Sequence, residues 1–332
     1  MNFMGLSRKY AVNRLLTKSE KDWQLRQRTR LNVEPHYQLS VIKMNSTFLE
    51  SVDKWYGWKG VMSCVAIVAI GMLGVFYCAM LFVSLARKRG VGDVSSDLSI
   101  MLMVTLMVVP VAIIVIWTLF RESFAYTHYP IRFNRKNREV HVFQLNGTVL
   151  TAKWNEIFFT LGELQYDQWE VRGHMLAPDK ETVIHTFALS YIGSVSPESI
   201  NSGNKKLRAD DYVHAHWEFI RRYMEDGPQN LVSQVQFCIP VDARRETVYL
   251  SFERMFANIA GAPQLLYWME SPIFLLFSLF RIFAMRTSKL PKWTAEVEAA
   301  CAIEPDDPYA IEGTLEGDRK AVFPQAAKAA GV

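Results

Sequence analysis

Two long apolar runs constrain this chain more than any other feature of its sequence. Residues 60–86 and residues 98–120 contain no charged side chain. Since a helix rises about 1.5 Å per residue, each run is long enough to cross the roughly 30 Å hydrocarbon core of a bilayer. The short polar connection between the runs predicts a transmembrane helical hairpin over residues 60–120, with spans at 60–86 and 98–120.

Basic residues near the ends of the two runs predict how the hairpin is oriented. Three lie in the connection, and eight flank the outer ends: Lys43, Lys54, Lys59, Arg121, Arg132, Arg135, Lys136 and Arg138. An even number of spans leaves both termini on one side, and positive charge favours the cytoplasm. We therefore expect both termini to be cytoplasmic. The first run begins too far from the N-terminus for a signal peptide, so we expect it to be retained as an anchor.

Amphipathic and basic side chains at the ends of the runs are candidates for the membrane–water interface. Aromatic rings prefer this layer, and long basic side chains can reach the headgroups from within a span. The expected interface anchors are Trp55, Tyr56, Trp58, Arg87, Lys88, Arg89 and Arg121. Within the spans, the pairs Gly60/Cys64 and Gly74/Cys78 are spaced to allow close contact with the second span. Pro110 predicts a kink in that span, and the lack of charge within both spans argues against an ion pathway.

The remaining sequence divides into four further segments. Residues 1–59 are basic and predict an N-terminal cytoplasmic arm, which either lies on anionic headgroups or is a solvated linker. Residues 121–260 predict a cytoplasmic α+β domain. Residues 261–290 are apolar but include Glu270 and Arg281, which favours an interfacial or re-entrant helix over a buried core helix or a third span. Residues 291–332 are acidic and predict an extended, solvated tail.

Alternating apolar residues after the second run predict an antiparallel β-meander. The expected strands are 129–133, 140–144, 149–152, 157–161, 166–171 and 182–189, with Asn146–Gly147 as a hairpin turn. The aromatic residues expected on the inner face are Trp154, Phe158, Tyr166 and Trp169. Beyond a polar loop at 194–206, we expect a helix capped by Asp210 or Asp211 and ending near Glu225, a strand at 231–239, and a helix at 244–258.

The sequence contains no recognisable catalytic or cofactor-binding motif. A GxSxG elbow, a Walker glycine loop and a GxGxxG fingerprint are all missing from it. His214 and His216 lie two residues apart on the expected helix, whereas helical zinc pairs lie four apart. The four cysteines have no disulfide or zinc-binding spacing, and a net charge of +4 is too small for a nucleic-acid footprint. We expect no enzyme activity, no cofactor, no metal and no nucleic-acid partner.

Two stretches of the chain carry a family resemblance. Residues 127–159 and residues 285–309 resemble a family of uncharacterised bacterial inner-membrane proteins that are often encoded beside type VI secretion effectors. The resemblance implies an immunity or accessory protein that neutralises a secreted toxin or helps to load it. The layout, a two-span hairpin followed by a strand meander and a helix, is also similar to that of membrane proteins with a pleckstrin-homology-like domain.

These observations predict a bacterial inner-membrane protein that binds a secreted effector without catalysis. The candidate binding residues are basic positions of the first predicted β-hairpin, namely Arg132, Arg135, Lys136 and Arg138, together with the acidic tail. The alternative is a lipid-binding or scaffold module, in which the same basic loop contacts anionic headgroups.

Overall fold

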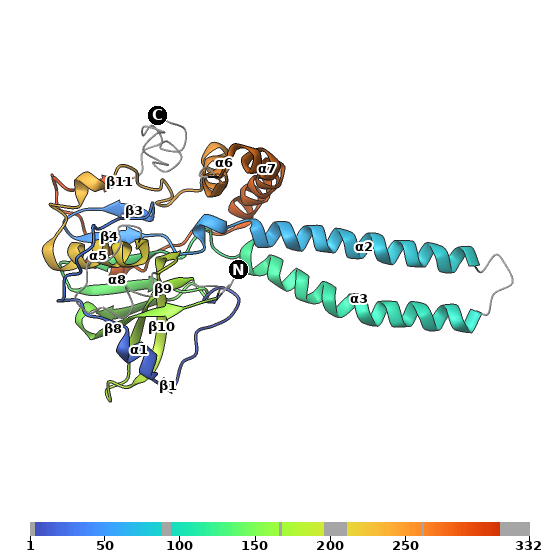
Figure 1. Cartoon of the computed structure of the whole chain (residues 1–332), viewed down its shortest axis with the longest axis horizontal. Coiled ribbons are helices and arrows are strands. Elements are labelled where there is room, and N and C mark those ends of the chain that lie inside the picture. The colour runs from blue at the N-terminus through green and yellow to red at the C-terminus, as the bar shows by residue number, and fades with distance from the viewer. Residues whose placement is uncertain (1–3, 88–93, 166–167, 196–210, 260–261, 313–332) are drawn as a thin grey trace. The chain divides into compact units, whose positions relative to one another are not determined.

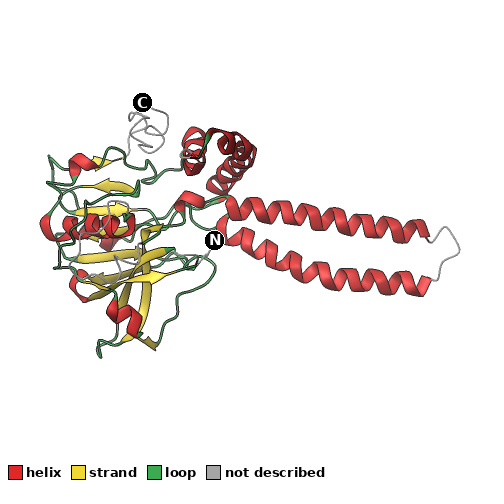
Figure 2. Cartoon of the chain, viewed as in Figure 1, coloured by secondary structure: helices red, strands yellow, loops and turns green. Residues whose placement is uncertain are grey.

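A computed structural model describes residues 4–87, 94–165, 168–195, 211–259 and 262–312 as two compact units (Figures 1 and 2). The first unit is built from residues 1–57, 127–246 and 290–332, and the second from residues 58–126 and 247–289. Both units are therefore discontinuous in sequence. The part of the chain that the structure describes combines α-helices with antiparallel β-sheets, as the sequence predicts.

Two antiparallel sheets form the first unit. The five-stranded sheet has the order β1-β10-β9-β8-β2, and the six-stranded sheet has the order β11-β3-β4-β5-β6-β7. Their strands are β1 (Arg14–Leu15), β2 (Gln24–Leu25), β3 (Val41–Met44), β4 (Phe48–Ser51), β5 (Ile131–Asn134), β6 (Glu139–Phe143), β7 (Val149–Lys153), β8 (Ile157–Glu163), β9 (Trp169–Leu176), β10 (Thr182–Gly193) and β11 (Ile311–Glu312). The expected meander thus divides after β7 into two sheets.

The apolar hairpin is inserted within a sheet. Strand β4 ends just before it and β5 begins just after it, and the two strands pair antiparallel with Ser51 opposite Ile131. The expected domain 121–260 is therefore incomplete, because its six-stranded sheet needs β3 and β4 from the N-terminal side of the hairpin. Pairing of β4 with β5 also holds the two ends of the inserted segment together.

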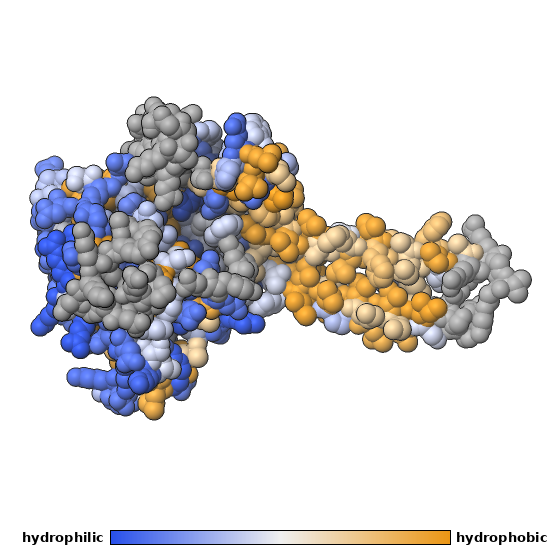
Figure 3. All heavy atoms as spheres, viewed as in Figure 1, coloured by the Kyte–Doolittle hydropathy of each residue, from blue (hydrophilic) through white to orange (hydrophobic). Residues whose placement is uncertain are grey.

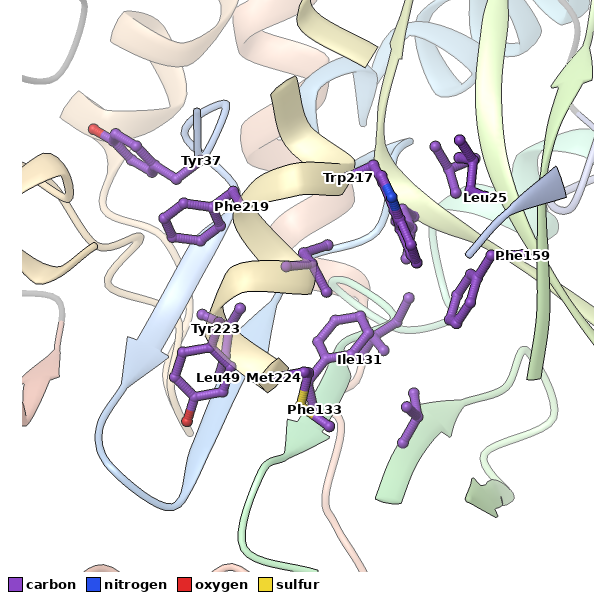
Figure 4. Packing of buried hydrophobic residues seen from close by; sticks show 14 of the residues in the cluster. Leu25, Tyr37, Leu49, Ile131, Phe133, Phe159, Trp217, Phe219, Tyr223 and Met224 are labelled. Atoms are coloured by element: carbon purple, nitrogen blue, oxygen red, sulfur yellow. The ribbon is translucent and has the colours of Figure 1, made fainter. Parts of the chain in front are cut away.

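Helix α5 (Tyr212–Asp226) closes the core of the first unit. Asp211 caps it by accepting a hydrogen bond from the His214 backbone N–H, and Gly227, with φ of 94°, ends it. The helix packs against β5, β9 and β10, so it contacts both sheets. Figure 4 shows Trp217 of α5 beside Phe159 of β8, with ring centroids 4.7 Å apart. Burial of such aromatic side chains supplies much of the hydrophobic stabilisation of a domain.

The N-terminal segment does not form a peripheral arm. Strands β1 and β2 flank the five-stranded sheet, β3 and β4 belong to the other sheet, and the short helix α1 (Lys18–Asp22) lies between β1 and β2. The arm was predicted because basic residues are frequent in this segment. Several of its scattered apolar residues are nevertheless buried, among them Leu16, Leu25 and Tyr37.

The C-terminal segment up to residue 312 is also folded. Helix α8 (Ala295–Ala300) begins at a capping Thr294, and β11 pairs with β3 through Ile311 opposite Met44. The prediction of an extended, solvated tail is therefore wrong for residues 291–312, where Val297 and Cys301 are buried against Phe48. Residues 313–332 lie outside the described residues.

Some details of the predicted elements differ from the structure. The 3-10 helix η3 (Val232–Gln234) replaces the expected strand at 231–239, because the Pro228 carbonyl accepts hydrogen bonds from residues 231 and 232 and turns the chain. The expected helix 244–258 begins later, where Thr247 caps α6 (Val248–Phe256). Trp154 and Trp169 are buried as predicted, but Phe159 rather than Phe158 is fully buried. Tyr166 and most of the expected loop at 194–206 lie outside the described residues.

The second unit contains the long helices. They are α2 (Val61–Arg87), α3 (Val94–Glu122) and α7 (Gln264–Thr287). Helix α6 and the 3-10 helix η4 (Ala257–Ile259) also belong to this unit and precede α7. All three long helices are long and apolar enough to cross a membrane, and Figure 3 shows the hydrophobic residues along their surfaces. Pro110 lies inside α3, which continues on both sides of it.

Neither Gly60 nor Gly74 brings α2 closer to α3. A Cβ on Gly74 would meet no atom within 4 Å, so this face of α2 is open. At the other end, a Cβ on Gly60 would lie 2.4 Å from the Cα of Arg281. Gly60 therefore permits close approach of α7 rather than of the second span.

Candidate functional site

The four basic residues predicted to bind a partner do not form one outward-facing surface. Arg132 is buried, Arg135 and Arg138 are half-buried, and only Lys136 is exposed. They lie on β5 and on the turn from β5 to β6, as predicted, but strand alternation and the turn direct their side chains to different places. The turn itself needs a left-handed residue, and Arg138 has φ of 57°.

Arg132 is the centre of a buried ion cluster. Its Nε donates to Glu50 Oε2 at 2.7 Å, and its Nη1 lies 3.2 Å from Glu298 Oε2. The guanidinium carbon lies 4.7 Å from the ring centroid of Phe48 and 4.8 Å from that of Trp293. Burial raises the pKa of Glu50, and the nearby Arg132 opposes this rise. Arg132 thus binds the C-terminal segment to the six-stranded sheet.

Arg138 and Lys136 also make contacts within the chain. Arg138 donates to the Met224 carbonyl and to Glu225, each at 2.7 Å, at the C-terminal end of α5. A cation there is favoured by the helix dipole and satisfies a carbonyl that lacks a helical partner. Lys136 pairs with Glu304 at 3.0 Å in an exposed contact. The loop that was expected to meet a partner is therefore largely engaged with its own fold.

Two of the expected interface anchors are also buried. Trp55 and Tyr56 are 8% and 2% exposed, and the Tyr56 hydroxyl donates to Glu246 within the first unit. Aromatic residues that precede an apolar run can act as interface anchors only where they do not pack into a neighbouring hydrophobic core. Trp58 is half-buried, Arg87 ends α2, and Lys88 and Arg89 lie outside the described residues.

Arg121 keeps a position suited to an anchor. It lies in the last turn of α3, and its guanidinium carbon is 5.2 Å from the ring centroid of the exposed Trp117. Such a pair presents a charge and an amphipathic ring together. Its interfacial role stays a prediction.

A second buried cluster, which sequence reasoning missed, surrounds Glu170 of β9. Lys54 forms an ion pair with Glu170, and Arg172 donates to it at 2.7 Å. Tyr10 donates to the same carboxylate at 3.0 Å and accepts from Lys54 at 2.8 Å. Burial lowers the pKa of Lys54 and raises that of Tyr10. The residues lie far apart in sequence, so no local pattern could identify them.

Two of the buried histidines in the first unit, His216 and His174, have strongly lowered pKa values. His216 on α5 is 1% exposed, and burial lowers its pKa to about 3. His174 on β9 is fully buried, with its Nδ1 2.8 Å from the Thr186 hydroxyl, and burial lowers its pKa to about 4. Both are core histidines, and among the described residues no group of three or more His, Cys, Asp or Glu is arranged to hold a metal ion.

A polar cluster in the second unit lies where α2 begins and α3 ends. The Glu122 carboxylate accepts from both the backbone N–H and the hydroxyl of Ser63, each at 2.6 Å. Lys59 donates to the Glu122 carbonyl at 2.8 Å and to the Tyr126 carbonyl at 2.5 Å. These contacts fix the two helices to each other at one end of the hairpin.

The first unit exposes apolar side chains at one edge of its five-stranded sheet. Strand β1 is the last strand in the order, and it pairs with β10 through Leu15 opposite Thr182. Leu15 is 63% exposed, Val12 43% and Ile184 38%. Ile184 lies two residues along β10 from Thr182, the partner of Leu15. We call Leu15 and Ile184 the β1–β10 edge patch.

The edge patch combines two properties of a protein-binding surface. Exposed apolar side chains gain free energy when a partner removes them from water, and an edge strand offers backbone hydrogen bonds to an incoming chain. This patch could not be recognised from the sequence, because two-residue strands lack a periodic pattern. Isolated Val and Leu residues in a basic segment suggested a loop instead.

Comparisons with known proteins identify the family. Residues 108–305, from the middle of α3 to beyond α8, match a family of unknown function, DUF6708. No curated protein and no solved structure matches the chain. The match covers more than half of the 332 residues and includes strands β5 to β10, so the chain belongs to the DUF6708 family.

Proposed function

We propose that this chain is a membrane-anchored binding module of the bacterial inner membrane that works without catalysis. Its anchor is the pair α2 and α3, whose surfaces are apolar along nearly their whole length. Because β4 and β5 pair directly, Ser51 and Ile131 must lie on the same side of the membrane, and the segment between them crosses an even number of times. Two crossings satisfy this condition, and the excess of basic residues outside the hairpin favours cytoplasmic termini.

We further propose that the first unit has a pleckstrin-homology-like fold. Four consecutive strands, β4 to β7, lie side by side in one sheet, and the next three, β8 to β10, lie side by side in the other. Helix α5 follows them and contacts both sheets. This order of four strands, three strands and a helix supports the resemblance, with the hairpin inserted after the first strand.

The partner that we propose is a secreted toxin of a type VI system, which the module neutralises by covering it or helps to load. The proposal of a protein partner rests on the β1–β10 edge patch, where exposed apolar side chains lie at the edge of a sheet. The basic residues 132–138 are engaged in internal contacts, so we move the proposed contact surface from that loop to the edge patch. The same contacts weaken the lipid-headgroup alternative.

Survival of cells that produce the toxin tests this function. The full chain is expressed in bacteria that carry the effector gene neighbouring its own, and we expect it to restore growth. Leu15→Asp and Ile184→Asp place a charge in the edge patch, and we expect each to weaken binding by about 1–2 kcal/mol, roughly tenfold, and to reduce protection.

The matched control is Ile303→Asp. Ile303 also belongs to the first unit and is 42% exposed, but it lies near the C-terminal end instead of on β1 or β10. We expect this variant to protect like the native chain. Failure of the native chain to protect would refute the immunity role. Equal loss of protection with all three substitutions would refute the edge patch as the contact surface.

A further inference from the structure

Helix α7 has its polar side turned inward and its apolar side turned outward. Between residues 265 and 283, every exposed residue is apolar: Leu265, Leu266, Trp268, Met269, Pro272, Ile273, Leu275, Leu276, Leu279 and Phe283. The opposite face includes the buried Ser278 and Arg281 and the half-buried Glu270. A helix on the surface of a water-soluble domain shows the reverse pattern. The outer face of α7 therefore suits a hydrocarbon environment.

Contacts within the second unit fix α7 at the end of the hairpin. Arg281 donates to the Lys59 carbonyl at 3.3 Å, just before α2 begins, and Gly60 lets the two backbones approach closely. Ser288, directly after α7, donates to the Glu122 carbonyl at 3.4 Å in the last turn of α3. The helix is thus held where α2 and α3 begin and end, beside the Lys59 and Glu122 cluster.

The path of the chain excludes α7 as a single complete crossing. Residues 127–246 and residues 290–312 both belong to the first unit, so they lie on one side of any membrane. The segment 247–289 must then cross an even number of times. Helix α6 has nine residues, about 14 Å at 1.5 Å per residue, which is too short for a span of about 30 Å. Helix α7 is the one described helix of this segment that is long enough to cross, and a single crossing would be an odd number. The segment therefore makes no complete crossing.

We propose that α7 lies within the membrane interface on the side of the first unit, with its apolar face in the acyl chains. The ligand of this face is the bilayer itself. Hairpin and α7 then form one membrane-embedded body, with the buried Arg281 shielded from lipid by the protein. This inference rests on the membrane anchoring of the proposed function, but not on the identity of its protein partner.

Cysteine labelling of the full chain in membrane vesicles tests this arrangement. Single cysteines replace exposed residues at the two ends of α7, Gln264→Cys and Arg286→Cys. A membrane-impermeant maleimide is applied from each side. We expect both to react from the side that labels Lys136→Cys in the first unit, whereas Gly90→Cys in the α2–α3 connection reacts from the other side. The native chain gives the background, since its cysteines are buried or lie in α2.

A second pair of variants reports whether lipid covers the outer face. Leu276→Cys and Leu279→Cys lie on the exposed apolar side of α7. We expect the impermeant reagent to label both poorly in membranes and readily after detergent is added. Labelling of Gln264→Cys and Arg286→Cys from opposite sides would overturn the proposal, as would ready labelling of Leu276→Cys and Leu279→Cys in intact membranes. Gly90→Cys and Lys136→Cys reacting from the same side would instead refute the anchor itself.

Discussion

At the scale of single residues, a charged side chain that lies among other basic residues in the sequence can be buried in the fold. Arg132 reads as surface charge because basic residues surround it in the sequence. In the fold it contacts two carboxylates and two aromatic rings that come from β4 and from the C-terminal segment. A buried ion pair adds little net stability, but removing one partner leaves an uncompensated charge.

Arg132→Ala is therefore expected to destabilise the first unit by about 3–5 kcal/mol, because Glu50 would remain buried without its cation. Lys136 lies in the turn between β5 and β6. Lys136→Ala removes an exposed ion pair and should change stability by less than about 0.5 kcal/mol. Urea denaturation of the full chain in detergent, followed by tryptophan fluorescence, measures both. Similar stability of the two variants would contradict the buried cluster.

Residue-level prediction succeeds where the cause is local. The Asp211 cap of α5 and the turn at Gly147, with φ of 85°, depend on neighbours within four residues. Trp55 and Tyr56 were misread because the same aromatic residues suit a membrane interface or a protein core. The cluster of Lys54, Glu170 and Tyr10 joins three segments that lie far apart in the sequence. Contacts between such distant residues cannot be recognised from a single sequence.

At the scale of elements, strands β5 to β10 follow from alternation in the sequence, and both hairpin helices follow from the length of their uncharged apolar runs. What periodicity cannot show is that β4 pairs with β5 across the inserted hairpin, since 79 residues separate Ser51 from Ile131 and hold two long helices. Short strands such as β1, β2 and β11 are equally hidden, because two residues cannot display a period. The N-terminal and C-terminal segments were consequently misread as an arm and a tail.

The close approach of Gly60 to Arg281 of α7 can be tested directly. Gly60→Ala would place a Cβ 2.4 Å from the Arg281 Cα at a position with φ of 101°, so we expect a loss of about 1–3 kcal/mol and displacement of α7 from α2. Gly74→Ala introduces the same methyl group into α2 where nothing lies within 4 Å. Thermal unfolding in detergent compares the two. A fully stable Gly60→Ala protein would rule out the close approach.

At the scale of the whole molecule, two discontinuous units share one chain that passes between them repeatedly. The first unit is completed only after residues 290–312 return to it, through β11 and the contacts of Trp293 and Glu298 with the Arg132 cluster. Any membrane segment between its parts must bring the chain back to the same side. This condition favours even numbers of crossings and places α7 along the membrane instead of through it.

The stability of the folded chain should fall with acidification in a range set by its buried histidines. His174 and His216 have pKa values lowered from 6.5 to about 4 and about 3, so the native state keeps them neutral while the unfolded chain takes up protons. Their stabilising contribution is complete above pH 6.5 and is lost as the pH falls below it. Each can add a slope of up to about 1.4 kcal/mol per pH unit.

Urea denaturation at pH 7, 6 and 5 measures this slope. Glu20, whose pKa is lowered from 4.5 to about 2, loses its contribution only below pH 4.5, outside this range. His216→Phe fills a similar volume without a titrating group and should flatten the slope between pH 6.5 and 5. His185→Gln, which changes an exposed histidine of β10, is the control substitution. An unaltered slope in His216→Phe would show that the ring can be protonated within the folded unit.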